Sequence, residues 1–166
     1  KVALKDIKLR TFITQDAQRD DLVGHVYDIT YGTVRENTDN LVVIDDSIVR
    51  GTQLKNLTIK KLWNNGAKEI HVRPACPPLM FPCIYASSTR TTSELAGRKA
   101  IRELEGKDIE NPEEYLNTNS EKYAQMIEWI RHDLNVTSLR YLAIEDMIAA
   151  IGLPAEQLCL HCWQGK

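Results

Sequence analysis

The sequence predicts an α/β fold in which a parallel sheet is followed by a helical C-terminal extension. Two short runs have the composition of strands, Leu41 to Ile44 and Ile70 to Val72, and the residues between them have helical spacing. A strand, a crossover helix and a second strand within about 30 residues are typical of a βαβ unit. We expect a core over residues 1–90 and a helical extension over residues 91–166.

The first strand of this unit, Leu41 to Ile44, lies between Asn40 and Asp45. Such a short, β-rich apolar run fits a strand that is buried on both faces of a parallel sheet. The helix that follows begins near Gln53 and stops at Asn65-Gly66. Its predicted apolar face is formed by three leucines, Leu54, Leu57 and Leu62.

In the second strand, Ile70 and Val72 alternate with the polar residues Glu69, His71 and Arg73. We expect the next segment to be a non-helical connection, because each proline removes a backbone donor and disfavours helix in the residue before it. Its prolines are Pro74, Pro77, Pro78 and Pro82.

The extension carries several helix signals, including serine and proline starts and glycine stops. The expected elements are a helix from Ser93 to Gly106 that packs Leu95, Ile101 and Leu104; a helix after Asn111-Pro112; a helix beginning near Ser120 with an apolar stripe of Tyr123, Met126, Ile127, Ile130 and Leu134; a short strand from Ser138 to Ala143; a helix from Ile144 to Ile151; and an irregular tail from Leu158 to Trp163.

The composition is that of a globular protein. The 166 residues are 43% hydrophobic and 27% charged, and the 21 Lys and Arg against 23 Asp and Glu give a net charge of -2. A nucleic-acid-binding protein is usually more basic. No apolar run approaches the roughly 18 residues that cross a bilayer, and Lys1 to Lys8 has no continuous hydrophobic centre of a signal peptide. We therefore predict a cytoplasmic protein with no nucleic-acid or membrane partner.

Charged residues follow the first strand directly. Asp45 and Asp46 stand where the strand ends, and the carboxyl edge of an open α/β sheet is where ligands bind. The loop from Ser47 to Thr52 then leads into the helix. Its backbone amides and the positive end of the helix dipole would face one point in space, which suits an anion.

The residue types of this loop suit a phosphorylated sugar. Gly51 allows a close backbone approach or a positive φ, Ser47 and Thr52 add hydroxyl donors, and Arg50 adds a cation. The two aspartates would repel a bare phosphate, so we expect them to meet sugar hydroxyls, a magnesium ion, or both. A magnesium-dependent nucleotide hydrolase is the alternative, but the chain contains neither a GxxxxGKS or GxxxxGKT loop nor a GxGxxG motif.

The four cysteines, Cys76, Cys83, Cys159 and Cys162, occur in a chain without a secretion signal, where disulfides are not expected. The residues alone leave two interpretations open. The CxxC of residues 159–162 is either a pair of free thiols or part of a zinc site with His161 or His71.

The segment from Leu41 to Thr52 resembles the phosphoribosyl pyrophosphate (PRPP) motif of the type I phosphoribosyltransferases. Its second half, Ser-Ile-Val-Arg-Gly-Thr, resembles the amidophosphoribosyltransferase family in particular. Three further segments agree with this family: Arg10 to Ile13, Pro77-Pro78 followed by Pro82-Cys83, and Cys159 to Cys162. The resemblance implies that residues 1–90 are the C-terminal portion of a type I phosphoribosyltransferase sheet, with its lid segment.

The resemblance also implies an activity. Enzymes of this family transfer ammonia, derived from glutamine, to PRPP and give 5-phosphoribosylamine and pyrophosphate, the first step of purine biosynthesis. Asp45 and Asp46 would hold the ribose hydroxyls and Mg²⁺, and their carboxylates would stabilise the positive charge that develops on the ribose carbon. Purine nucleotides as inhibitors and a homo-oligomer of the full-length enzyme are implied as well. The 5-phosphate would lie in the loop of Ser47, Ile48, Val49, Arg50, Gly51 and Thr52.

One branch of the family carries a 4Fe–4S cluster, bound by a Pro-Cys after a double proline and by a C-terminal CxxC. Cys83, Cys159 and Cys162 fall on these positions. Thiolates are soft donors that suit iron and sulfide. A fourth ligand has no counterpart in this chain, and we regard its absence as a better interpretation than its replacement by Cys76.

The sequence departs from the family in several places. The lid segment is acidic where the family carries Lys and Arg, and no cysteine nucleophile of a glutaminase precedes Cys76. We therefore expect a C-terminal piece of a longer enzyme that does not itself hydrolyse glutamine. A rival hypothesis is a non-catalytic regulatory module that binds PRPP or a nucleotide, and a third is a cluster-bearing structural element. The departing residues are Gln15, Asp16, Asp20, Asp21 and Asp28 in the lid, Gln53 in place of a second threonine, and Ala86-Ser87-Ser88 in place of Gly-Ile-Asp.

Overall fold

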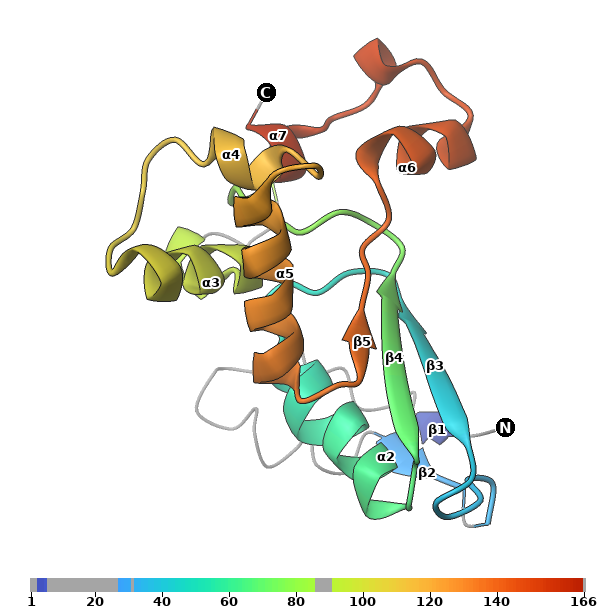
Figure 1. Cartoon of the computed structure of the whole chain (residues 1–166). Helices are drawn as coiled ribbons and strands as arrows, with labels where there is room; N and C mark the ends of the chain where they lie inside the picture. Colours follow the sequence, from blue (N-terminus) through green and yellow to red (C-terminus); the bar gives the residue numbers. More distant parts are fainter. Residues whose placement is uncertain (1–2, 6–26, 31, 86–90, 166) are drawn as a thin grey trace.

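The structure is a computed structural model that describes residues 3–5, 27–30, 32–85 and 91–165. It contains a parallel sheet with the strand order β3-β4-β5 and a small antiparallel pair, β1 with β2 (Figure 1). The α/β class with a parallel sheet is therefore confirmed. The strands are β1 (Ala3–Lys5), β2 (Tyr27–Ile29), β3 (Asn40–Asp45), β4 (Glu69–Pro74) and β5 (Ser138–Leu139).

The crossover between β3 and β4 is helical, as predicted, but its first part is wider than an α-helix. A π-helix, η3 (Leu54–Ile59), precedes α2 (Lys60–Asn64). Leu54, Ile59 and Leu62 are buried, whereas Leu57 is only half-buried, so the predicted three-leucine face was partly wrong. In the wider turn of a π-helix, residues five positions apart come to the same side, which places Ile59 with Leu54 toward the core.

The C-terminal part is helical, as expected, and the helix from Ile144 to Ile151 has the predicted bounds. The expected strand is shorter, since only Ser138 and Leu139 pair with β4. The tail expected to be irregular, Leu158 to Trp163, instead enters a short helix at His161, and a second short helix directly precedes it. The elements after residue 91 are η5 (Thr92–Glu94), α3 (Ala96–Glu105), α4 (Glu113–Leu116), α5 (Glu121–Leu134), β5, α6 (Ile144–Ile151), η6 (Ala155–Gln157) and α7 (His161–Gln164).

The expected packing of Leu104 was wrong, because its side chain is 40% exposed. Helix α3 instead turns Ala96, Ala100 and Ile101 toward the core, and it ends at Gly106 with a φ of +69°. Leu104 lies three residues after Ile101 in the last turn of the helix, where the neighbouring elements no longer cover it.

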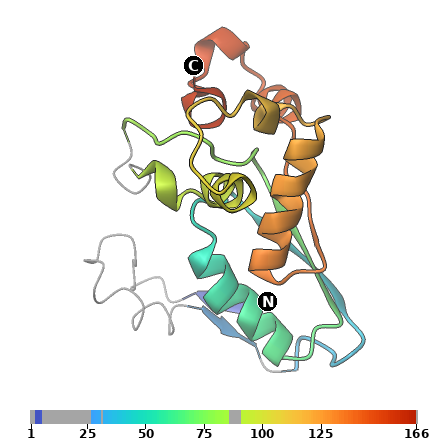
Figure 2. The same ribbon diagram turned by 60° about the vertical axis from the view of Figure 1, so that its left-hand side comes forward.

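Strand β3 contradicts the expectation of burial on both faces. Val42 and Ile44 are 63% and 76% exposed, and Leu41 and Val43 are half-buried. β3 is an edge strand of the parallel sheet, and in the described part of the chain helices α2 and α5 lie over one face of this sheet (Figures 1 and 2). The central strand is β4, whose Ile70 and Val72 are fully buried. An apolar strand composition cannot tell whether one face or both are covered.

The main hydrophobic cluster draws residues from both sides of the predicted boundary at residue 90. Ile59 and Ile70 pack in the same cluster as Ile101, Met126 and Ile130. The division into residues 1–90 and 91–166 stays a prediction.

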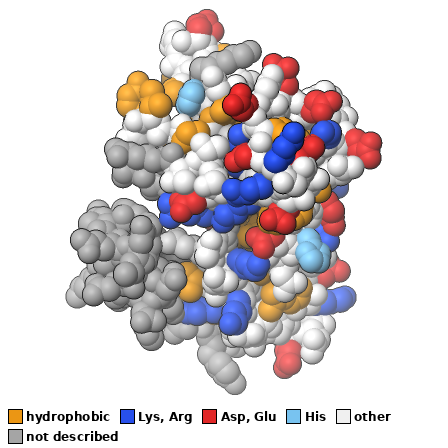
Figure 3. Space-filling model, turned by 90° about the vertical axis from the view of Figure 1, so that its left-hand side faces the viewer, with side chains coloured by type: hydrophobic (Ala, Val, Ile, Leu, Met, Phe, Trp, Pro, Cys, Tyr) orange, Lys and Arg blue, Asp and Glu red, His pale blue; other side chains and the backbone are white. Residues whose placement is uncertain are grey.

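The surface is mixed in charge. In Figure 3, Lys and Arg side chains gather along the middle of one face, with Asp and Glu beside them. Arg131 and Glu128, for example, form an ion pair of 2.6 Å on α5. Within the described residues, no helix combines the length and the apolar character that crossing a bilayer requires.

Candidate functional site

The carboxyl ends of the three parallel strands lie at one edge of the sheet, and the loops that follow them leave from that edge (Figure 1). Asp45, the last residue of β3, is opposite Pro74, the last residue of β4. The Ala75 N–H donates to the Asp45 carbonyl at 2.8 Å, so the two loops diverge only beyond this point. The predicted site thus begins where open α/β sheets bind their ligands.

The two aspartates differ in their surroundings. Asp45 is half-buried, and its Oδ1 accepts the Asp46 N–H at 3.0 Å, whereas Asp46 is exposed. Magnesium is usually held by one or two carboxylates together with substrate phosphates and water. Two adjacent carboxylates, one fixed by a backbone bond and one open to solvent, fit such a donor set.

The loop of residues 47–52 is anchored at its centre and open at its ends. Ile48 is buried in the core with 2% exposure, and the Val49 carbonyl accepts the Ala96 N–H at 2.8 Å. Ser47 is half-buried and Thr52 is exposed. The side chain of Ile48 is therefore unavailable to a ligand, and its role in the predicted site is restricted to its backbone.

Gly51 adopts the positive φ that the sequence predicts, with a value of +77°. Its carbonyl accepts the Lys55 N–H at 2.9 Å, which is the first bond of the following helix. A Cβ at this position would lie 3.3 Å from Leu134 Cδ2 of α5. Backbone conformation and close packing thus both favour glycine where the loop enters the helix.

Arg50 forms an ion pair with a residue outside the loop. Its guanidinium Nη2 lies 2.6 Å from Oε2 of Glu94 on η5. The sequence analysis did not identify Glu94 as a neighbour of the site. Glu94 is 44 positions from Arg50 in the sequence, and no local pattern indicates that the two residues meet. A phosphate bound in this loop would have to share Arg50 with this carboxylate.

Two of the three predicted cluster cysteines are brought together. The Cys162 thiol hydrogen-bonds with Cys83, and Cys159 is close enough to act on it electrostatically. Burial, the hydrogen bond with Cys83 and the charges of the other two thiols together raise the pKa of Cys162 to about 11. Cys159 is exposed, and Cys83 and Cys162 are partly buried.

Backbone bonds hold the cysteine tail against the proline segment. The N–H groups of Met80 and Phe81 both donate to the Cys162 carbonyl, at 2.9 and 3.0 Å. The Phe81 ring lies against His161, with ring centroids 6.1 Å apart. These contacts join residues about 80 positions apart in the sequence.

Cys76 has different neighbours. It is buried with Leu79, Leu95 and Met147, and burial, with the charges of Asp46 and Asp45, raises its pKa. An apolar setting of this kind suits a structural thiol better than a metal ligand. The structure gives no support for Cys76 as a replacement for the fourth cluster ligand.

The zinc interpretation also finds no support in the described part of the chain, where no three His, Cys, Asp or Glu side chains are grouped closely enough to bind one metal ion. His71 lies within β4 and contacts Ser138 Oγ at 2.8 Å and Glu69 Oε2 at 3.1 Å. Thiolates that bind different irons of one cluster need not meet at a single point, so the 4Fe–4S cluster stays a prediction.

Several sequence predictions lie outside the described residues. These are the segment Arg10 to Ile13, most of the acidic lid, and the departure at Ala86-Ser87-Ser88.

No protein-family model matches the chain. Amidophosphoribosyltransferases of Mycobacterium tuberculosis and Staphylococcus epidermidis are both 34% identical to it, over 126 and 130 residues. That of Methanothermobacter thermautotrophicus is 34% identical over 125 residues. These matches cover 76%, 76% and 75% of the chain but only 20%, 21% and 21% of the relatives, so the chain spans about a fifth of their length.

Solved structures agree with the sequence matches. The glutamine PRPP amidotransferase of B. subtilis, determined with ADP and GMP, superposes with a TM-score of 0.64 and 27% identity. It covers 99% of this chain, which corresponds to 31% of the B. subtilis chain. A structure described as the allosteric regulatory enzyme of purine biosynthesis gives the same TM-score, 0.64, with 28% identity.

Proposed function

We propose that this chain, which is a distant homologue of the amidophosphoribosyltransferases, forms part of a PRPP site at the carboxyl edge of its parallel sheet. One observation carries the proposal: the accessible Asp45-Asp46 pair is followed by a fixed loop that enters a helix through the positive-φ Gly51. Oxygen acceptors beside an anion-binding loop match the chemistry of a sugar phosphate.

In this proposal the loop binds the 5-phosphate through its backbone amides and the hydroxyls of Ser47 and Thr52. Asp45 and Asp46 accept hydrogen bonds from the ribose hydroxyls and hold Mg²⁺. Mg²⁺ held by these two carboxylates would supply positive charge to neutralise the departing pyrophosphate. The two carboxylates also stabilise the positive charge that develops on the ribose carbon while ammonia attacks. The product is 5-phosphoribosylamine, as for the full-length enzymes that the chain resembles.

Cys83, Cys159 and Cys162 are the residues that would hold a 4Fe–4S cluster. The Cys83–Cys162 contact and the partial exposure of these thiols support this assignment. A cluster bound there would cross-link the C-terminal tail to the proline segment. A fourth ligand comes from outside this set of three.

Partners beyond PRPP are proposed on the basis of the relatives. The B. subtilis structure contains ADP and GMP, which supports purine nucleotides as inhibitors. Ammonia derived from glutamine, and a homo-oligomer, belong to the full-length enzyme in this proposal.

A non-catalytic regulatory module remains the second candidate function. The observation that favours it is the acidic lid segment, where the family that the chain resembles carries Lys and Arg. A regulator needs to bind PRPP or a nucleotide but not to promote the departure of pyrophosphate.

Calorimetric titration of the chain with PRPP and Mg²⁺ tests the shared claim. We expect magnesium-dependent binding that Asp46→Asn weakens by roughly tenfold to a hundredfold or more, since the loss of a charged acceptor costs roughly 1.5–3 kcal/mol. Asp146→Asn, the same change on exposed α6, is the control and leaves binding unchanged. A folded chain that binds no PRPP would overturn the proposal. Release of pyrophosphate in the presence of ammonia then separates an enzyme from a regulator.

A further inference from the structure

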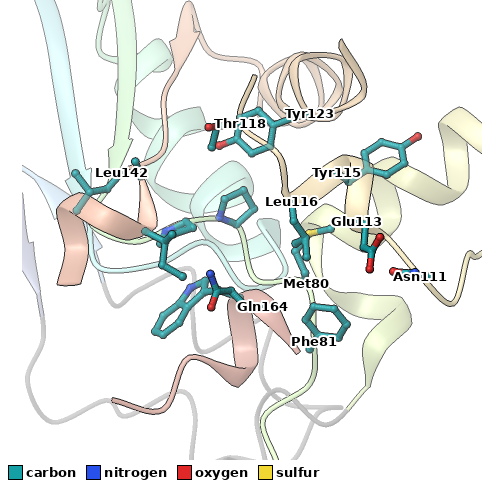
Figure 4. A pocket seen from close by; sticks show the side chains of 15 residues that line it. Met80, Phe81, Asn111, Glu113, Tyr115, Leu116, Thr118, Tyr123, Leu142 and Gln164 are labelled. Carbon is teal, nitrogen blue, oxygen red and sulfur yellow. The ribbon is translucent and has the colours of Figure 1, made fainter. Parts of the chain in front are cut away.

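A concave site lies away from the proposed PRPP loop. It is a cavity of about 360 Å³ between the proline segment, the region around α4 and the start of α5, and helix α7 (Figure 4). None of its lining residues belongs to the segment of residues 45–52. Cavities of this volume are the size of small-molecule sites.

The walls of the cavity are largely apolar and aromatic. Pro77 and Pro78, Met80 and Phe81 come from the proline segment, and Tyr123 and Trp163 face them from α5 and α7. In Figure 4, Met80 and Phe81 follow one another along one side, while Thr118 and Tyr123 lie together at a distance from them. Faces of aromatic rings attract flat apolar groups and cations.

The polar groups make the cavity negatively charged. Glu113 is the one charged residue among those that line it, and the lining includes no Lys, Arg or His. Figure 4 shows the Glu113 carboxylate next to Asn111 at the end where Phe81 lies. Both residues are exposed, so a ligand can reach them from solvent. An anion is repelled here, whereas a cation meets a carboxylate, an amide oxygen and an aromatic ring.

The cavity is held in shape without a ligand. The Met80 and Phe81 amides donate to the carbonyl of Cys162, which directly precedes the lining residues Trp163 and Gln164. Two parts of the lining, the proline segment and helix α7, are therefore joined by two backbone hydrogen bonds. A preformed site binds with a smaller ordering cost than one that must first be assembled.

We propose that this cavity binds a small organic cation with a flat apolar body. The ammonium group lies at Glu113 and Asn111, and the apolar body lies between Phe81 and the double proline. This ligand class differs from PRPP, which carries several negative charges. The proposal is therefore independent of the function assigned to the aspartate loop.

Phenethylammonium and hydrocinnamate form a matched pair of probes, because each carries a phenyl ring on a two-carbon chain and only the charged group differs. We expect phenethylammonium to shift the backbone amide resonances of Phe81, Trp163 and Gln164 in two-dimensional NMR. Hydrocinnamate at the same concentration leaves them in place. Resonances of residues 45–52 are unaffected by either probe.

Variants of two neighbouring glutamates complete the experiment. Glu113→Gln is expected to weaken phenethylammonium binding about twofold to fivefold, as for the loss of one solvent-exposed charge contact. Glu114→Gln is the control, because it removes the same charge from the next residue, which does not line the cavity. Both residues are exposed, so neither change threatens the fold.

Three results would overturn the proposal. One is equal resonance shifts with the cation and the anion, which would mean that the cavity does not discriminate between ligand charges. Another is an equal loss of affinity in the two glutamate variants. The third is the absence of shifts in a chain whose NMR spectrum is that of a folded protein. PRPP binding at the aspartate loop can persist in all three cases.

Discussion

Gly51 is the point at which backbone geometry shapes the candidate PRPP loop. Its φ of +77° belongs to the left-handed region, and its Cα faces Leu134 at the end of α5. The residue is therefore constrained both by its own conformation and by a neighbour far away in the sequence. Gly152, at the end of α6, has a similar φ of +76° but nothing within 4 Å of a Cβ placed there.

These two glycines allow strain and crowding to be separated. Gly152→Ala is expected to lower the free energy of unfolding by about 1 kcal/mol, the usual cost of a left-handed alanine. Gly51→Ala is expected to cost about 2 kcal/mol, because the new methyl group must also displace Leu134. Urea denaturation of both variants measures the difference. Equal losses would show that the contact with Leu134 contributes nothing.

Helix α5 is the element that connects the candidate PRPP loop with the cavity. Tyr123 in its first turn lines the cavity, and Leu134 at its last residue packs next to Gly51. The helix is also tied to the crossover helix by the Lys55–Asp133 ion pair of 2.6 Å. Its stability therefore supports both candidate sites.

The start of α5 depends on Ser120, whose Oγ accepts the Tyr123 N–H at 3.0 Å. Ser120→Ala removes this cap and is expected to cost about 1 kcal/mol of stability. Ser93→Ala is the control, because Ser93 lies inside the short helix η5, whose N-cap is Thr91, and therefore does not occupy a cap position. Thermal or urea unfolding checks the prediction, and a loss in the control as large as in Ser120→Ala would contradict it.

At the scale of the whole molecule, one carboxylate joins three helices. Glu105 of α3 accepts hydrogen bonds from Lys122 Nζ of α5 at 2.5 Å and from the Tyr115 hydroxyl of α4 at 2.7 Å. These two hydrogen bonds, that from Lys122 foremost, lower the pKa of Glu105 below its ordinary value of 4.5. Burial and the bond to Glu105 raise the pKa of Tyr115 to about 12, so the phenol stays a donor at neutral pH.

This junction predicts a pH dependence of stability. A carboxyl whose pKa is lower in the folded than in the unfolded chain stabilises the fold above pH 4.5, and this contribution is lost as the pH falls through the folded-state pKa. Glu105→Gln should therefore be less stable than the parent chain at neutral pH. We expect the gap to narrow in acid. Urea midpoints measured between neutral pH and about pH 3 test this, and a gap that is constant with pH would contradict the assignment.

Features that depend on local interactions could be predicted from the sequence, and features that depend on distant contacts could not. The α6 boundaries, the glycine stops and the positive φ of Gly51 were predicted correctly, because helical periodicity and steric limits act within a few residues. The burial of Val42 and Ile44 was predicted wrongly, because it depends on whether another layer covers β3. That Ile59 is buried in the core, and Leu57 is not, likewise depends on a π-helical turn that the apolar pattern does not specify.

The sequence by itself determined the α/β class and the distant homology to amidophosphoribosyltransferases, and it located the candidate aspartate loop, since each of these depends on patterns within continuous stretches of chain. Only the tertiary structure decided that Glu94 pairs with Arg50, that Cys162 meets Cys83, and that a cavity opens beside Glu113. These contacts join residues brought together by packing of distant elements. Packing depends on the shapes of whole faces of helices and sheets, and these shapes cannot be inferred from any single segment of the sequence.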